Sequence, residues 1–139
     1  MNKIMQENKV KLVINGKKVE AFSGDTILQV AAKEGIYIPN LCYHEKLKPY
    51  GACRLCLVEV EFNGKKRIVA SCAYTVREDL FVYTESPEVE RIRKNLVELY
   101  LAIFPFAPEI KKLAERYGLK GTRYRKENAY CSRCGLCVR

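Results

Sequence analysis

Four cysteines in the first half of the chain have the spacing of ligands to an iron–sulfur cluster. They follow the pattern Cys42-x10-Cys53-x2-Cys56-x15-Cys72. A [2Fe–2S] cluster needs four thiolates, and one loop can supply the close pair while flanking segments supply the other two. Structural zinc sites usually combine two close pairs, whereas only Cys53 and Cys56 are close here. The spacing therefore predicts a [2Fe–2S] site, with zinc or inert buried thiols as the alternatives.

Small and apolar residues surround these cysteines. Gly51 and Ala52 precede Cys53 and would keep bulky side chains away from backbone amides that approach the cluster. Four leucines could keep water out: Leu41, Leu47, Leu55 and Leu57. His44 is the single histidine, and a Rieske-type centre needs two histidines on one iron. We therefore expect His44 to tune the cluster by hydrogen bonding and not to ligate it.

Three further cysteines, Cys131-x2-Cys134-x2-Cys137, have the spacing of a second centre. They resemble the start of a bacterial [4Fe–4S] run, in which the first three cysteines bind one cluster and the fourth usually ligates another. We expect a [4Fe–4S] cluster here, with its fourth ligand supplied by a larger ferredoxin-like module or by another subunit, or else with one labile iron. Zinc or an empty thiol cluster is the alternative. Arg133 and Arg139 would balance the negative charge of the cluster.

Composition and charge narrow the class of function. The 139 residues are 48% hydrophobic, which is ordinary for a folded globular protein. The net charge of +9 could indicate a nucleic-acid or acidic protein partner. However, an oxidised cluster with four thiolates carries about −2, and no helix-turn-helix, finger or stacked-aromatic pattern accompanies the charge. We expect no nucleic-acid partner.

The N-terminal residues lack an apolar stretch of signal-peptide length, and the apolar run at residues 99–107 is too short to cross a bilayer. We therefore expect no transmembrane segment and a cytoplasmic location. Because that compartment keeps thiols reduced, seven cysteines favour metal ligation over disulfides.

Turn and cap signals in the first half predict a small mixed sheet that holds one helix. Asn15-Gly16 and Asn63-Gly64 are hairpin turn signals, because both residue types tolerate positive φ. The expected strands are residues 10–14, 18–22, 57–62, 67–71 and 80–84. Residues 23–26 begin a helix that Gly35 ends, so Cys42 to Cys56 fall on the long loop after it.

The second half predicts two helices and a basic tail. Ser86, Pro87 and Glu88 form a helix start, and the helix should run to about Phe104. We expect an apolar stripe to pack on the domain, while other residues face elsewhere. The stripe is Val89, Ile92, Leu96, Leu99 and Ile103, and the residues facing elsewhere are Glu90, Arg91, Arg93 and Lys94. A second helix spans residues 109–117, and the segment from Lys120 is either a solvated linker or a dock for an acidic partner.

With these elements placed, the stretch from about Val10 to the helix after Ser86 resembles the N-terminal ferredoxin-like domain of a redox-complex family. This family includes the large iron–sulfur subunit of respiratory complex I, iron–sulfur subunits of NAD-linked and electron-bifurcating hydrogenases, and related formate dehydrogenases. The matching residues are Ile38-Pro39, Leu41-Cys42, Tyr43-His44, Gly51-x-Cys53-Arg54-x-Cys56, Val58-Glu59-Val60-Glu61 and Ser71-Cys72. The long first gap differs from the Cys-x4-Cys of plant-type ferredoxins. The resemblance implies a β-grasp fold and one-electron transfer.

The chain departs from this family in one region. Complex I and hydrogenase relatives continue with a histidine and three cysteines that bind a [4Fe–4S] cluster, but residues 101–118 contain neither residue type. We expect that cluster to be absent and the relay to be shortened.

These observations predict an α+β chain: a β-grasp [2Fe–2S] ferredoxin-like domain at residues 1–86, a helical connector at 87–126 and an incomplete [4Fe–4S] segment at 127–139. No Gly-rich phosphate loop follows a strand, and no nucleophile has a candidate base. We therefore expect a non-catalytic electron-transfer subunit of an oxidoreductase complex, whose flavoprotein or NAD(P)H-binding partner does the two-electron chemistry. The alternatives are a free-standing ferredoxin and a zinc-stabilised interaction module.

Overall fold

Two Asn-Gly turns fold the strand segments into hairpins in the computed structural model, which describes residues 8–139. β1 (Lys9–Ile14) pairs antiparallel with β2 (Lys17–Phe22), and β3 (Leu57–Phe62) pairs antiparallel with β4 (Lys65–Ala70). Asn15 and Gly16 have φ of 50° and 81°, the left-handed conformation that tight hairpin turns require. Both predicted hairpins are confirmed.

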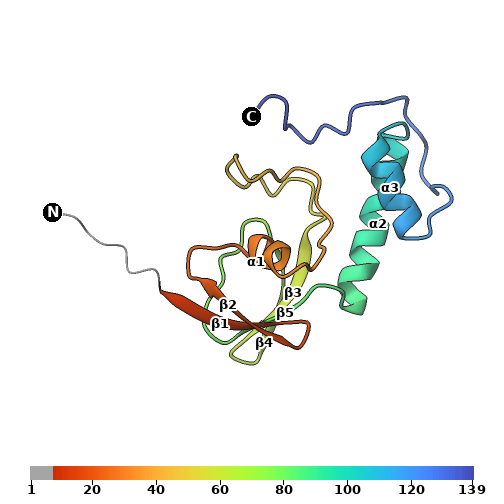
Figure 1. Ribbon diagram of the computed structural model, residues 1–139. Coiled ribbons are helices and arrows are strands. Elements are labelled where there is room, and N and C mark those ends of the chain that lie inside the picture. The colour runs from red at the N-terminus through yellow and green to blue at the C-terminus, as the bar shows by residue number, and fades with distance from the viewer. Residues whose placement is uncertain (1–7) are drawn as a thin grey trace.

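A central fifth strand joins the hairpins into one mixed sheet (Figure 1). β5 (Leu80–Tyr83) runs parallel to β1 and antiparallel to β3, so the order is β2-β1-β5-β3-β4. Leu12 is opposite Leu80, and Val60 is opposite Val82, and all four side chains are buried. One face of the sheet therefore forms the floor of a hydrophobic core.

The helix α1 (Ile27–Lys33) covers that core. Thr26 begins the helix with a capping box, because its hydroxyl accepts a hydrogen bond from the Gln29 amide at 3.3 Å and its own amide donates to the Gln29 side chain at 2.9 Å. Gly35 follows the helix with a φ of 71°. The helix buries Ile27, Leu28, Val30 and Ala31.

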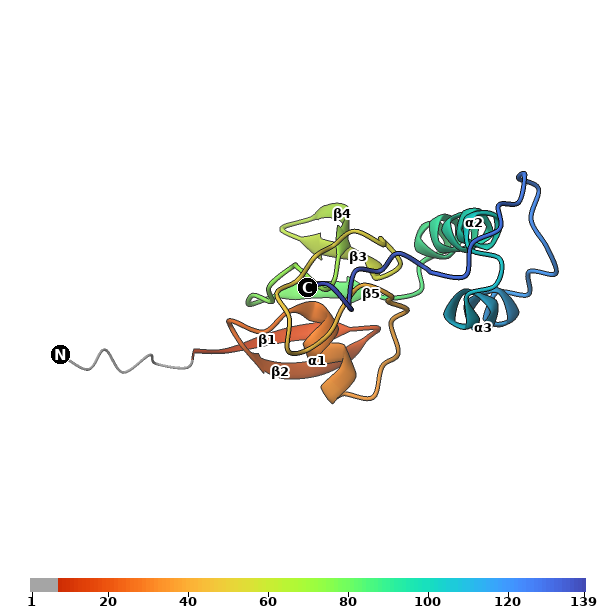
Figure 2. The ribbon, with the colours of Figure 1, turned by 90° about the horizontal axis from the view of Figure 1, so that it is seen from above.

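Two more helices lie beside the sheet and form a second core (Figure 2). The Ser86 hydroxyl caps α2 (Pro87–Ile103) by accepting a hydrogen bond from the Val89 amide at 3.3 Å. α3 (Pro108–Arg116) packs against α2, and Gly118 follows it with a φ of 67°. No helix among residues 8–139 combines the length and apolar composition that a membrane span needs.

The buried face of α2 differs from the predicted stripe. Val89 and Val97 are buried, but Leu99 is 41% exposed. Arg93, which we expected to face outward, is 1% exposed. The prediction was wrong for Leu99 and Arg93 because it considered only the spacing of apolar residues. The Arg93 guanidinium donates hydrogen bonds to the backbone carbonyls of Leu55 and Leu57, so the helix turns Val89, Arg93 and Val97 inward. The other predicted stripe residues, Ile92, Leu96 and Ile103, are half-buried.

The segment after α3 is irregular and returns along α2 toward the cysteine loop (Figure 1). The Glu127 amide donates to the Ala102 carbonyl at 2.8 Å, and the Phe106 amide donates to the Ala129 carbonyl at 3.4 Å. The second core contains residues from the cysteine loop as well as from both helices. The division expected at residues 86 and 126 remains a prediction.

Candidate metal centre

The four cysteines of the first set are shared between the two hydrophobic cores. Cys56 and Cys72 belong to the core between the sheet and α1, whereas Cys42 and Cys53 belong to the core formed with α2 and α3. All four side chains are buried. Cys56 directly precedes β3, Cys72 follows β4, and the other two come from the loop between α1 and β3. The structure therefore divides the predicted set between two hydrophobic cores, two cysteines in each, and its role as one ligand set remains a prediction.

Backbone hydrogen bonds hold Cys72 beside Cys56. The Ser71 amide donates to the Cys56 carbonyl at 3.2 Å, and the Ser71 carbonyl accepts from the Leu28 amide at 3.0 Å. Ser71 is thus joined to β3 on one side and to α1 on the other. This leaves the turn after β4 little freedom, so the Cys72 thiol lies against the Cys56 thiol.

The thiol pKa values reveal two pairs. Hydrogen bonding from Cys72 lowers the pKa of Cys56 to about 6 despite its burial. The same hydrogen bond, together with burial, raises the pKa of Cys72. Burial raises the pKa of Cys53, opposed by the backbone amides of Cys42, Leu55 and Leu41, while the charge of Cys42 adds to the rise. The thiols therefore interact as Cys56 with Cys72 and Cys53 with Cys42.

The thiols of the first set lie in two adjacent pairs. Within residues 8–139, no three His, Cys, Asp or Glu side chains gather around a single metal position. Two adjacent thiol pairs could give each iron of a [2Fe–2S] unit two ligands. A buried hydroxyl with no conventional hydrogen-bond partner, Ser71 Oγ, lies in the same place and suits a site that gains an acceptor when filled.

The loop before Cys56 has an unusual backbone conformation. Gly51 has a φ of 65° and Arg54, between the two close cysteines, has a φ of 61°. A Cβ at Gly51 would meet no atom within 4 Å, so conformation and not crowding is what favours glycine there. The backbone of Arg54 is therefore left-handed, a conformation that residues with long side chains rarely adopt. Such backbone conformations are typical of functional loops.

Two side chains from α2 support this loop, and the sequence pattern led us to neither. Arg93 donates from Nε to the Leu55 carbonyl at 3.0 Å and from Nη2 to the Leu57 carbonyl at 2.5 Å. The Tyr100 hydroxyl donates to the Cys53 carbonyl at 2.8 Å. Burial, followed by the charges of the nearby thiols, raises the pKa of Tyr100 to about 12. The spacing of Arg93 from Val89 and Val97, four residues each way, is the one signal that could have revealed its inward position.

The second set of cysteines is less enclosed. Cys131 and Cys137 are exposed and Cys134 is half-buried, and the Arg133 amide donates to the Cys131 sulfur at 3.4 Å. Arg139 Nη2 donates to the Cys42 carbonyl at 2.9 Å, so this segment contacts the loop of the first set. The structure does not bring the three thiols of the second set around one point.

Cysteines of both sets line a small cavity of about 110 Å³. Its lining includes Cys42 and Cys53 of the first set and Cys134 of the second, together with Tyr100 and Phe104. The Arg133 guanidinium lies over the Phe104 ring, 5.7 Å from its centroid. One cysteine of the second set thus adjoins one pair of the first.

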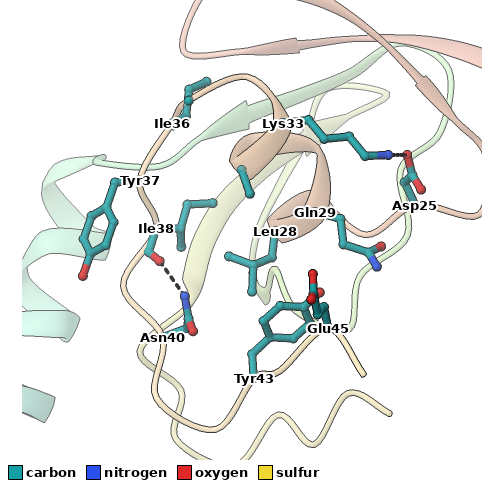
Figure 3. Close-up of a pocket in the computed structure, with 12 residues that line it drawn as sticks. Asp25, Leu28, Gln29, Lys33, Ile36, Tyr37, Ile38, Asn40, Tyr43 and Glu45 are labelled. Atoms are coloured by element: carbon teal, nitrogen blue, oxygen red, sulfur yellow. Dashed lines mark hydrogen bonds and ion pairs between the residues drawn. The ribbon is translucent and has the colours of Figure 1, made fainter. Parts of the chain in front are cut away.

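His44 and a wider hollow complete the surroundings of the loop. His44 is exposed, and its Nδ1 accepts a hydrogen bond from the Lys46 amide at 3.2 Å. Its expected role in tuning the cluster remains a prediction. A hollow of about 590 Å³ lies between α1 and residues 35–45, where Tyr43 and Leu28 face each other and Lys33 pairs with Asp25 at 2.8 Å (Figure 3). Its lining contains no cysteine, histidine or serine.

The cysteine loop lies in a segment that matches a known family. Residues 7–87, more than half of the chain, match the family described as the 2Fe-2S iron-sulfur cluster binding domain. The chain belongs to this family. The matched range contains all four cysteines of the first set and ends at the start of α2, so the 2Fe-2S domain corresponds to the sheet, α1 and the cysteine loop.

Relatives of this 2Fe-2S domain protein extend the resemblance beyond the matched range. A subunit of the NADH-quinone oxidoreductase of Rickettsia bellii is 38% identical over 128 residues, which are 86% of this chain and 18% of the relative. The mitochondrial NADH-ubiquinone oxidoreductase 78 kDa subunit of Neurospora crassa is 46% identical over 96 residues, which are 69% of this chain and 13% of the relative. The chain therefore spans less than a fifth of these relatives.

A solved structure has the same architecture. The crystal structure of an NAD+-reducing [NiFe]-hydrogenase in the H2-reduced state matches with a TM-score of 0.80 and 28% sequence identity, over 93% of this chain and 64% of that chain. The predicted α+β fold and the predicted relationship to complex I and hydrogenase subunits are both confirmed.

Proposed function

We propose that this chain is a one-electron relay subunit of a multi-subunit oxidoreductase, with a [2Fe–2S] cluster bound by Cys42, Cys53, Cys56 and Cys72. The observation that carries the proposal is the pairing of four buried thiols where the two cores adjoin. Membership of the 2Fe-2S domain family and likeness to oxidoreductase and hydrogenase subunits support it. When bound, a [2Fe–2S] cluster supplies reversible one-electron transfer.

The residues of the chain have three tasks in this function. The four thiolates bind the irons, and the Cys56 thiol is prepared for this because Cys72 favours its ionised form. Leu41 and Leu55, both buried, exclude water from the site. Arg93 and Tyr100 hold the loop carbonyls, so the loop keeps its shape when the charge of the site changes.

The partners we propose are the flavoprotein, NAD(P)H-binding or other redox subunits of a larger complex. We assign two-electron chemistry with a nicotinamide to these partners, because such chemistry needs a nucleotide-binding site and we find no Gly-rich phosphate loop after a strand in these 139 residues. A free-standing ferredoxin that moves between enzymes is the alternative. Purification under native conditions separates the two: a stable stoichiometric complex supports the subunit, and a lone chain that is fully active as a carrier overturns it.

We also propose a second centre, a [4Fe–4S] cluster on Cys131, Cys134 and Cys137, whose fourth ligand comes from a further segment or a partner subunit. The position of Cys134 at the cavity that Cys42 and Cys53 line supports this proposal, because it offers a short path between the centres. Cys131 and Cys137 must turn inward on binding, and their exposed, irregular segment allows this movement. A structural zinc ion is the competing occupant.

The test is metal and sulfide analysis of the anaerobically purified complex together with low-temperature EPR. Cys53→Ser and Cys56→Ser should each remove or strongly alter the [2Fe–2S] signal, while Cys134→Ser should leave it and remove the second signal. An unchanged signal in both of the first two variants overturns the ligand assignment. About one tightly bound zinc, with no second iron centre, overturns the [4Fe–4S] proposal alone.

A further inference from the structure

Ser71 is a buried polar residue whose side chain lacks a partner. It is 0% exposed, and its hydroxyl oxygen is the one buried side-chain nitrogen or oxygen among residues 8–139 with no hydrogen-bond partner. A buried hydroxyl left unsatisfied costs about 1–3 kcal/mol. Alanine would avoid this cost and would fit the same space. The hydroxyl therefore needs an acceptor that appears only in another state of the site.

The backbone leaves Ser71 little choice of neighbour. Its amide donates to the Cys56 carbonyl at 3.2 Å and its carbonyl accepts from the Leu28 amide at 3.0 Å, so the residue is held between β3 and α1. The pairing of Leu57 with Ala70 in β3 and β4 continues by one residue through the hydrogen bond to Cys56, so Ser71 lies opposite Cys56 and their side chains share a face. A neutral thiol is a weak hydrogen-bond acceptor. A thiolate is a strong acceptor and cannot act as a donor, because it carries no proton.

We propose that the Ser71 hydroxyl donates an O–H···S hydrogen bond to the Cys56 thiolate in the cluster-bound protein and raises the reduction potential of the [2Fe–2S] centre. This inference rests on the proposed function. On reduction, the site accepts one electron from the redox partner and becomes more negative by one charge, and Ser71 keeps its proton throughout. A donor to a ligand sulfur stabilises the more negative state more strongly, so it favours reduction.

The test is a redox titration of the purified, cluster-bound protein, in which the EPR signal of the reduced [2Fe–2S] centre is measured at each potential. Ser71→Ala should lower the midpoint potential, since one hydrogen bond changes an equilibrium by about fivefold to tenfold. A tenfold lower ratio of reduced to oxidised centre corresponds to about 59 mV for one electron. The free energy of unfolding of the cluster-free protein should not fall, because in that state the variant removes an unsatisfied hydroxyl.

A matched pair of variants isolates the hydroxyl from the volume of the side chain. Ser71→Thr keeps the hydroxyl and Ser71→Val replaces it with a methyl group of similar shape, so Thr should have the higher potential. This pair also answers the question if Ser71→Ala fails to retain its cluster. Ser86→Ala is the control elsewhere in the chain: it removes the cap of α2 and should cost about 1 kcal/mol of stability without moving the potential.

Each outcome separates this inference from the proposed function. A normal [2Fe–2S] signal with equal potentials in the wild type and Ser71→Ala, or in the Thr and Val variants, overturns the role of Ser71 and leaves the proposed function standing. A wild-type protein without any [2Fe–2S] signal overturns the proposed function itself. A lower potential in both hydroxyl-free variants supports the inference.

Discussion

The guanidinium of Arg93 donates a hydrogen bond to the carbonyl oxygen of Leu55 at 3.0 Å, and this contact joins α2 to the loop that holds Cys53 and Cys56. A second hydrogen bond reaches the Leu57 carbonyl. Arg93 is 1% exposed, and it takes part in none of the ion pairs found among residues 8–139. A buried cation is costly unless polar groups satisfy it, so these carbonyls are what make its position tenable.

We expect Arg93→Ala to destabilise the folded protein by about 2–5 kcal/mol, because it removes two charge-assisted hydrogen bonds and leaves two buried carbonyls without donors. Arg93→Lys should recover part of the loss. Chemical denaturation of the cluster-bound protein measures both. The exposed neighbour Lys94→Ala is the control and should change little. Equal stabilities of Arg93→Ala and Lys94→Ala would show that the loop does not depend on this contact.

From the packing of α2 we predict which of its apolar residues contribute most to stability. Val97 is buried against the helical core, whereas Leu99 is 41% exposed. Val97→Ala should cost about 1–3 kcal/mol through lost burial and the cavity it leaves, and Leu99→Ala should cost less than about 1 kcal/mol although it removes more atoms. Thermal unfolding of the two variants compares them directly. The reverse ranking would mean that Leu99 packs against a partner subunit.

The pairing of Glu98 with Arg123 should make the attachment of the C-terminal segment dependent on pH. The Glu98 carboxylate accepts hydrogen bonds from the Arg123 side chain at 2.9 and 3.0 Å and from its amide at 2.9 Å, and these lower the pKa of Glu98 in the folded state. Because the pKa of Glu98 is lower in the folded state, the ionised carboxylate stabilises the fold at pH values above the ordinary glutamate pKa of about 4.3. This stabilisation is lost as the pH falls through the folded-state pKa.

We therefore expect Arg123→Gln to be less stable than the wild type at pH 7 and the difference to shrink as the pH falls below about 4.3. Denaturation of the cluster-free protein across this range measures it and avoids acid loss of the cluster. The exposed pair of Arg91 with Glu88, at 3.7 Å, offers the control, because Arg91→Gln should show almost no such dependence. A constant difference between Arg123→Gln and the wild type would contradict the prediction.

Tyr100→Phe should weaken the loop slightly without removing the site. The variant loses the hydrogen bond to the Cys53 carbonyl, worth about 0.5–1.5 kcal/mol, and keeps the stacking on Phe104, whose ring centroid lies 5.9 Å away. Since the pKa of Tyr100 is raised to about 12, the neutral phenol favours the fold below pH 10 and loses this effect as pH rises through 12. A wild-type minus Tyr100→Phe absorbance titration should show this late ionisation, and a midpoint near 10 would place the hydroxyl in solvent.

Local signals in the sequence were sufficient for most of the secondary structure. The Asn-Gly turns, the Thr26 and Ser86 caps and Gly35 act through the backbone within four residues, so their effects can be read without knowledge of the fold. The spacing of the first four cysteines likewise indicated a [2Fe–2S] domain, because the chemistry of two irons sets the number of sulfurs and the family match agrees.

Only the tertiary structure decided which groups face one another. The pairing of Cys56 with Cys72 and of Cys53 with Cys42 arises because the sheet core and the helical core adjoin at this loop, and no local pattern specifies that contact. Arg93 is buried and Leu99 exposed because carbonyls 36 and 38 residues away compete with apolar spacing for the inward face of α2. Burial depends on partners distant in the chain, and periodicity cannot reveal those partners.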